Sequence, residues 1–80
     1  MKYDIHVTDS DIYYGEKRSN SNCPIALAIK WAFPNDKVSV GRDVFCVDKI
    51  CLPLPLTAIN FIKDHDRGYN AREFVFSVNF

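Results

Sequence analysis

With 80 residues, of which 48% are hydrophobic and 14% aromatic, the chain has the composition of one small folded domain, which excludes an intrinsically disordered protein. Ten basic and ten acidic residues give a formal net charge of zero, which argues against broad binding to nucleic acids or membrane surfaces, because both need a basic excess. No stretch approaches the ~20 consecutive apolar residues of a membrane span, and the first six residues lack the apolar run of a signal peptide, so we expect a cytoplasmic protein.

The first quarter of the chain predicts a strand, a helical turn and a loop. Residues 2–7 alternate apolar and polar side chains, which is typical of a strand with one buried face. Thr8 or Asp9 would then cap one short helical turn, which Gly15 would end in a left-handed conformation. Residues 16–22 are polar and predict a surface loop.

The strongest helix signal in the sequence covers residues 24–33. Side chains that can cap a helix precede it at positions 21–23, and Pro24 suits the first turn, where its missing N–H costs nothing. Leu27 and Trp31 widen its apolar stripe, and we expect Trp31 to be partly buried on the flank. Since so apolar a helix must be covered on most of its circumference, it should be the buried spine of the domain. The stripe itself consists of Ile25, Ala28, Ile29 and Ala32.

A hairpin is predicted next. Residues 37–40 alternate polar and apolar side chains, and residues 44–47 form an apolar run, with a short turn that contains Gly41 between them. Asp48 and Lys49 would turn the chain again. The following segment, residues 52–55, should be extended, because each of its prolines biases the preceding residue away from the helical region.

A second helix over residues 56–66 and a last strand over residues 73–80 complete the prediction. Pro55 suits the start of this helix, whose end we interpret as a polar tail that includes His65. The buried side of the helix should comprise Ala58, Ile59, Phe61 and Ile62, and the inner face of the strand Phe74, Phe76, Val78 and Phe80.

The order strand, helix, strand, strand, helix, strand predicts an α+β fold in a single domain covering residues 1–80. One antiparallel-rich sheet with both helices on one face would bury the apolar side chains. A ferredoxin-like split βαβ plan has this order, and a less regular α+β fold is the alternative.

Three cysteines and two histidines are the residues most often associated with catalysis or metal binding. A thiol at a helix N-terminus can have a lowered pKa, so Cys23 could be a nucleophile, but neither His6 nor His65 is expected nearby to act as its base. We therefore interpret Cys23 as a structural residue. Cys46 and Cys51 should be free thiols in a reducing compartment, with Cys46 a small core residue. The spacing of these residues does not reproduce a structural zinc site, and no metal or cofactor is expected.

Side chains typical of protein-binding surfaces gather in the predicted loops and helix ends. Tyrosine and arginine are over-represented among the residues that dominate binding energy. For any single tyrosine, the alternative is that it closes the rim of a small core. The candidate partner-binding residues are Tyr13, Tyr14, Arg18, Asp64, Asp66, Arg67 and Tyr69.

A series of short motifs extends over nearly the whole chain: Ile5-x-Val7, Asp11-Ile12 with Gly15, Asn22-Cys23-Pro24-Ile25-Ala26-Leu27-Ala28, Val38-Ser39-Val40-Gly41, Leu52-Pro53, Phe61-Ile62 with Asp66-Arg67-Gly68, and Phe74-x-Phe76. In these motifs the chain resembles a family of small proteins carried by bacteriophages and prophages, mostly of undetermined role. The motifs contain no catalytic pattern.

This resemblance implies a phage protein that acts in the cytoplasm of a bacterial host. Small phage-borne domains without catalytic residues are often inhibitors of host machinery, including anti-CRISPR and other anti-defence proteins. We therefore expect a non-enzymatic inhibitor that contacts a host protein complex such as a CRISPR effector. The alternatives are a small accessory domain that binds nucleic acid or a regulatory partner, and a thiol enzyme that uses Cys23. The oligomeric state stays open.

Overall fold

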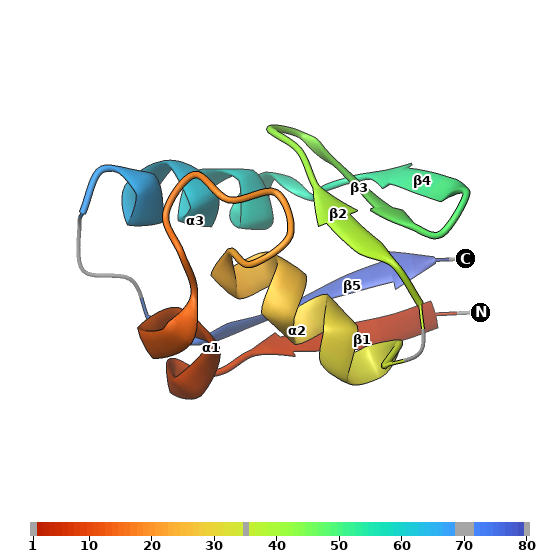
Figure 1. Ribbon diagram of the computed structural model, residues 1–80, viewed down its shortest axis with the longest axis horizontal. Coiled ribbons are helices and arrows are strands. Elements are labelled where there is room, and N and C mark those ends of the chain that lie inside the picture. Colours follow the sequence, from red (N-terminus) through yellow and green to blue (C-terminus); the bar gives the residue numbers. More distant parts are fainter. Residues whose placement is uncertain (1, 35, 69–71, 80) are drawn as a thin grey trace.

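The computed structural model describes residues 2–34, 36–68 and 72–79, and in these ranges the chain forms three helices and five strands (Figure 1). Their order confirms the predicted α+β class. The elements are β1 (Lys2–Val7), α1 (Asp9–Tyr14), α2 (Pro24–Ala32), β2 (Val38–Val40), β3 (Val44–Val47), β4 (Ile50–Pro53), α3 (Leu56–Asp66) and β5 (Phe74–Asn79). Phe80, expected at the end of the last strand, lies outside the described residues.

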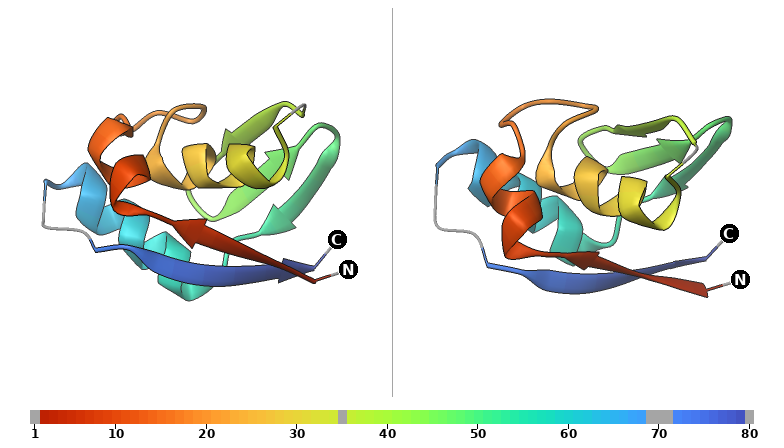
Figure 2. Two further views of the ribbon diagram at one scale, coloured as in Figure 1. Left: turned by 90° about the horizontal axis from the view of Figure 1, so that it is seen from below. Right: turned by 60° about the horizontal axis from the view of Figure 1, so that its bottom comes forward.

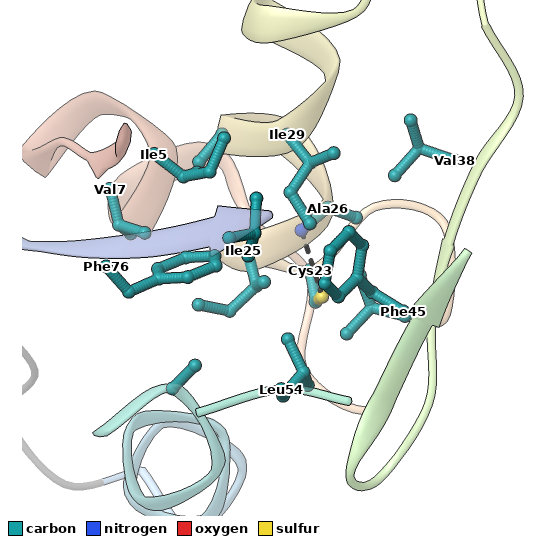
Figure 3. Packing of buried hydrophobic residues seen from close by; sticks show 14 of the residues in the cluster. Ile5, Val7, Cys23, Ile25, Ala26, Ile29, Val38, Phe45, Leu54 and Phe76 are labelled. Carbon is teal, nitrogen blue, oxygen red and sulfur yellow. Dashed lines mark hydrogen bonds between the residues drawn. The ribbon is translucent and has the colours of Figure 1, made fainter. Parts of the chain in front are cut away.

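The strands form two sheets rather than the single sheet that we expected. β1 pairs with β5, β2 pairs with β3 and β3 pairs with β4, and all three pairings are antiparallel. The sheets stay apart because α2 packs against both β1 and β2 and so fills the space between them. Figure 3 shows Ile25 and Ile29 of α2 between Phe76 of one sheet and Phe45 of the other.

The β1–β5 sheet has one buried and one exposed face, as the alternation of its residues predicts. Ile5 and Phe76 are direct neighbours across the two strands, and both are buried. Lys2 lies opposite Asn79, so the two outer ends of this sheet are side by side at one end of the molecule (Figure 1). The other end of the molecule carries α1 and the last turn of α3.

The helix α2 is the buried spine that the sequence predicts, with Ile25, Ala26 and Ile29 at zero exposure. Ala32, which we assigned to the same stripe, is exposed. It is the last residue of α2, and the next residue, Phe33, contacts Tyr3 of β1 instead. Cys23 caps the helix as predicted, because its Sγ accepts a hydrogen bond from the Ala26 N–H at 3.4 Å (Figure 3).

Gly15 ends α1 for a different reason from the one that we expected. Its φ of −69° and ψ of 142° are extended and not left-handed. A Cβ atom at this position would lie 2.5 Å from the Pro24 ring, a distance that real Cβ atoms do not adopt. Glycine is therefore required by the close approach of the α1 end to the start of α2.

The β3–β4 hairpin contains a disulfide bond, so the prediction that Cys46 and Cys51 are free thiols is wrong. A two-residue turn, Asp48–Lys49, sets the register that places these cysteines directly opposite each other, with their Cα atoms 4.1 Å apart. Cys51 is exposed and Cys46 half-buried, so Cys46 is also less deeply buried than we expected.

The helix α3 begins and ends at the predicted residues, Leu56 and Asp66. Its buried side is the predicted one, with Ala58 and Phe61 buried and Ile59 and Ile62 half-buried. The prediction for the end of the helix is wrong, because His65 is only 8% exposed. Its ring stacks on Phe61 of the preceding turn, with the centroids 6.0 Å apart. The i, i+4 spacing places both rings on the buried side of the helix.

Candidate functional site

Three large aromatic side chains project from α1 and α2 into solvent. Tyr13, Tyr14 and Trp31 are 81%, 71% and 80% exposed, and we call them the aromatic surface. The Tyr13 and Tyr14 rings meet edge to face with their centroids 5.0 Å apart. The prediction that Trp31 is partly buried is wrong. A cluster of aromatic rings that the core does not need is typical of a binding surface.

The Asp11 carboxylate links the two helices that carry this surface. Its Oδ2 accepts hydrogen bonds from the backbone N–H and the hydroxyl of Thr8, both at 3.0 Å, which completes a capping box at the start of α1. Its Oδ1 accepts a hydrogen bond from the indole N–H of Trp31 at 3.2 Å. Asp11 is itself only 3% exposed, so a buried carboxylate fixes an exposed indole in place.

A hollow of about 390 Å³ lies beside the aromatic surface, between α1 and the last turns of α2. Tyr14 and Trp31 contribute aromatic walls, and Leu27 and Pro34 add further apolar area. Lys30 and Asp11 are the charged residues of its lining, and the Lys30 ammonium donates a hydrogen bond to the Ser21 carbonyl. An apolar hollow with charged residues in its lining suits an apolar side chain of a partner, with a polar neighbour beside it.

The other predicted binding residues form a second group, at the end of α3. The backbone N–H of Arg18 donates a hydrogen bond to Asp66 Oδ1 at 2.9 Å, and Arg18 has a positive φ of 58°. The loop before α2 is thereby fixed to the last turn of α3. Asp64 and Arg67 are exposed nearby in sequence on the same helix end, whereas Tyr69 lies outside the described residues.

The helix α1 and the last turn of α3 lie at the end of the molecule that is remote from the outer ends of β1 and β5, whereas the last turn of α2 runs back toward those ends (Figures 1 and 2). The structure therefore brings Tyr13 and Tyr14 to the same end as Arg18 and Asp66, as a shared surface requires. It adds Trp31, which the sequence analysis missed as a binding residue. A signal for it existed: successive helix residues are rotated by about 100°, so Trp31 faces away from Ile29, two positions before it.

Cys23 lies on the floor of a smaller hollow, of about 190 Å³, whose rim includes Arg18, Arg42 and Asp66. Burial raises the pKa of the Cys23 thiol above its ordinary value, and this effect outweighs the backbone hydrogen bonds that lower it. The helix N-terminus therefore does not make this thiol acidic. Neither histidine is among the residues that line the hollow.

The described ranges, residues 2–34, 36–68 and 72–79, contain neither a metal-binding cluster nor a membrane-spanning helix. No group of three or more His, Cys, Asp or Glu side chains there is placed to hold a metal ion. None of the helices in these ranges is both long and apolar enough to cross a membrane.

Comparisons of the chain with protein families, with curated proteins and with solved structures find no match.

Proposed function

We propose that this protein is a binding domain that contacts a partner protein through the aromatic surface. The observation that carries the proposal is the exposure of Tyr13, Tyr14 and Trp31 on neighbouring helices, with the indole held by a buried carboxylate. An indole that is fixed before binding loses little conformational freedom on contact. This pre-organisation favours a role in recognition.

We further propose that the partner is a host defence complex, such as a CRISPR effector, which the protein inhibits in the bacterial cytoplasm without catalysis. The resemblance to small phage-borne proteins supports this choice of partner. The buried thiol of Cys23, with its raised pKa, supports action by binding rather than by nucleophilic attack.

A phage-challenge assay tests both proposals. The protein is expressed in bacterial strains that each carry one active defence system, and each strain is infected with a phage that this system restricts. We expect plaques to return in a CRISPR-carrying strain. A Tyr14→Ala/Trp31→Ala variant should lose the effect, and Leu56→Ala, which shortens an exposed apolar side chain elsewhere, should keep it.

Two results would contradict the proposals in different ways. Restored plaques that do not depend on Tyr14 and Trp31 would place the binding surface elsewhere. No restoration in any CRISPR-carrying strain, together with no binding to the purified effectors, would remove a CRISPR effector as the partner, and no restoration in any of the strains would remove a defence complex of any tested kind. Tight binding to duplex or single-stranded DNA that weakens steeply with salt would favour the nucleic-acid alternative.

A further inference from the structure

The strand β5 has a second edge that β1 does not use. Within residues 2–34, 36–68 and 72–79, β5 pairs with β1 alone. Along a strand in an antiparallel pair, alternate residues direct their N–H and C=O groups to opposite sides. Every second residue of β5 therefore presents both backbone groups away from β1, where another extended chain could bond to them.

This edge also lacks the features that protect the other strand edges. β5 contains no charged residue and no proline. By contrast, β1 carries Lys2 and Asp4, β4 ends at Pro53, and β2 is only three residues long. Charges, prolines and shortness are the common ways in which proteins prevent pairing at an edge. The free edge of β5 is thus the one best suited to accept a strand.

Two hollows lie along this edge. One, of about 440 Å³, is bounded by Thr57 and Phe61 of α3 and by Phe74 and Val75 of β5. Phe74 and Val75 belong to opposite faces of the strand, and no residue of β1 lines the hollow, so it lies along the free edge. The Phe61 and Phe74 rings, whose centroids are 4.8 Å apart, form the apolar part of its wall, and Asn60, Asp64, Arg72 and Glu73 supply polar and charged groups around it.

The second hollow, of about 340 Å³, lies at the other half of β5. It is bounded by Leu54 and Pro55, which precede α3, and by Ser77 and Val78. These β5 residues again come from opposite faces of the strand, and β1 is again not involved. The two hollows thus follow one edge from end to end.

We propose that the free edge of β5 accepts an extended segment of a partner protein as a third strand of the β1–β5 sheet. The backbone of the segment would bond to the unpaired groups of β5, and its apolar side chains at alternate positions would enter the two hollows. Alternate side chains of a strand are roughly 7 Å apart, so a segment of about six residues spans the edge.

A segment of a partner fits this edge better than a second copy of the chain. Both views of Figure 2 show α3 close to β5, running beside the strand toward the end where α1 lies. Antiparallel pairing of two β5 edges would place both α3 helices on the same face of the joined sheet, next to the shared edge. The two helices would then compete for the same space, whereas a single extended chain carries no helix to place there. This surface is separate from the aromatic surface of the proposed function, which α1 and α2 form.

Selection from a displayed library of random peptides of about seven residues, on the immobilised full chain, tests this proposal. We expect the selected peptides to alternate apolar and polar residues. Thr57→Trp, which fills one hollow from an exposed position on α3, should weaken their binding by about tenfold or more. The matched control is Lys63→Trp, an exposed change on the same helix that lines neither hollow.

Amide hydrogen exchange supplies a second readout. Bound peptide should slow the exchange of alternate β5 amides, which are the ones that do not bond to β1. The proposal would be overturned if no peptide is selected, if Thr57→Trp binds as tightly as the control variant, or if the peptides protect α1 and α2 instead. Protection of β5 that rises with protein concentration without peptide would show that a second copy is the occupant.

Discussion

At the scale of single residues, Asp11 has the most connected position in the candidate site, because each of its carboxylate oxygens serves a different helix. One oxygen completes the cap of α1, and the other holds the indole of Trp31 on α2. The two residues are 20 positions apart, so one buried side chain sets both the start of a helix and the geometry of an exposed ring. Local structure and binding surface therefore depend on the same group.

Asp11→Ala should release the indole and remove the cap together. We expect the free energy of unfolding to fall by about 1–3 kcal/mol, because Thr8 loses its partner and the indole its anchor. Trp31 is the single tryptophan of the chain, so its fluorescence reports this site alone. The emission of the parent protein should be close to that of water-exposed tryptophan, and its anisotropy should drop in the variant. Asp9→Ala, an exposed change in the same turn, should change neither property.

The thiol of Cys23 predicts a dependence of stability on pH. Because burial raises the pKa of the folded thiol, the unfolded chain loses this proton first as the pH rises. The contribution of Cys23 to stability is therefore complete below the unfolded pKa of about 8.5 and declines above it. Cys23→Ser should keep the cap and flatten this part of the stability curve between pH values of about 8 and 10.

Alkylation tests whether the Cys23 thiol is buried and unreactive in the folded protein. Iodoacetamide should label native Cys23 slowly at neutral pH and rapidly after unfolding, since the thiolate is the reactive form and the folded side chain is buried. Rapid labelling of the native protein, with loss of inhibition in Cys23→Ser, would instead favour the enzyme alternative.

At the scale of elements, local signals predicted the helices well and the pairing of strands poorly. α3 was predicted to the residue because a proline precedes it and its apolar residues recur with helical spacing. Alternation in β1 and β5 predicted their buried faces, but alternation does not specify a partner, so the separation into two sheets was missed. The prolines at 53 and 55 predicted only an extended segment, whereas residues Ile50–Pro53 form β4 and pair with β3.

The miss at Cys46 and Cys51 has a related cause. The expectation of free thiols depends on the redox compartment alone. The disulfide between Cys46 and Cys51 depends instead on the register of the β3–β4 hairpin, whose second strand the sequence does not predict. For the candidate site, Tyr13, Tyr14, Arg18 and Asp66 were predicted because exposed turns favour such residues. The contact between Asp11 and Trp31 could not be predicted, because it depends on how two separate helices pack.

The disulfide should contribute only modestly to stability. It closes a short loop, with the two cysteines five positions apart, so it removes little freedom from the unfolded chain. We expect the Cys46→Ser/Cys51→Ser variant to lose about 2 kcal/mol of unfolding free energy, as measured by urea denaturation. The parent protein in dithiothreitol should match the variant. A much larger loss would mean that the bond supports more than its own hairpin.

At the scale of the whole molecule, the exposed aromatic side chains and the packed core should respond differently to mutation. Tyr13→Ala and Tyr14→Ala should each leave the melting temperature nearly unchanged, because these side chains are exposed, whereas Trp31→Ala should lower it slightly, because the buried Asp11 carboxylate loses a donor. Alanine variants at true hot spots should lose about 2 kcal/mol or more of the free energy of binding to the partner, as measured by calorimetry. Ile50→Ala, an exposed apolar change on the opposite hairpin, should bind normally. Equal binding by all four variants would exclude the aromatic surface as the contact.

The pairing of β1 with β5 has a consequence for how the chain reaches its native state. The Ser77 hydroxyl donates to Asp4 across this pair, a separation of 73 positions, whereas β2, β3 and β4 meet through short turns. Closing so large a loop costs about 4 kcal/mol of chain entropy beyond a constant term, and contacts of such long range form slowly. On the ribosome, β1 must therefore wait for nearly the whole chain to emerge before its backbone is paired with β5. Until then, α2 is the element that covers Ile5 and Val7 of β1. The nascent protein is most prone to aggregation and to chaperone binding during this interval.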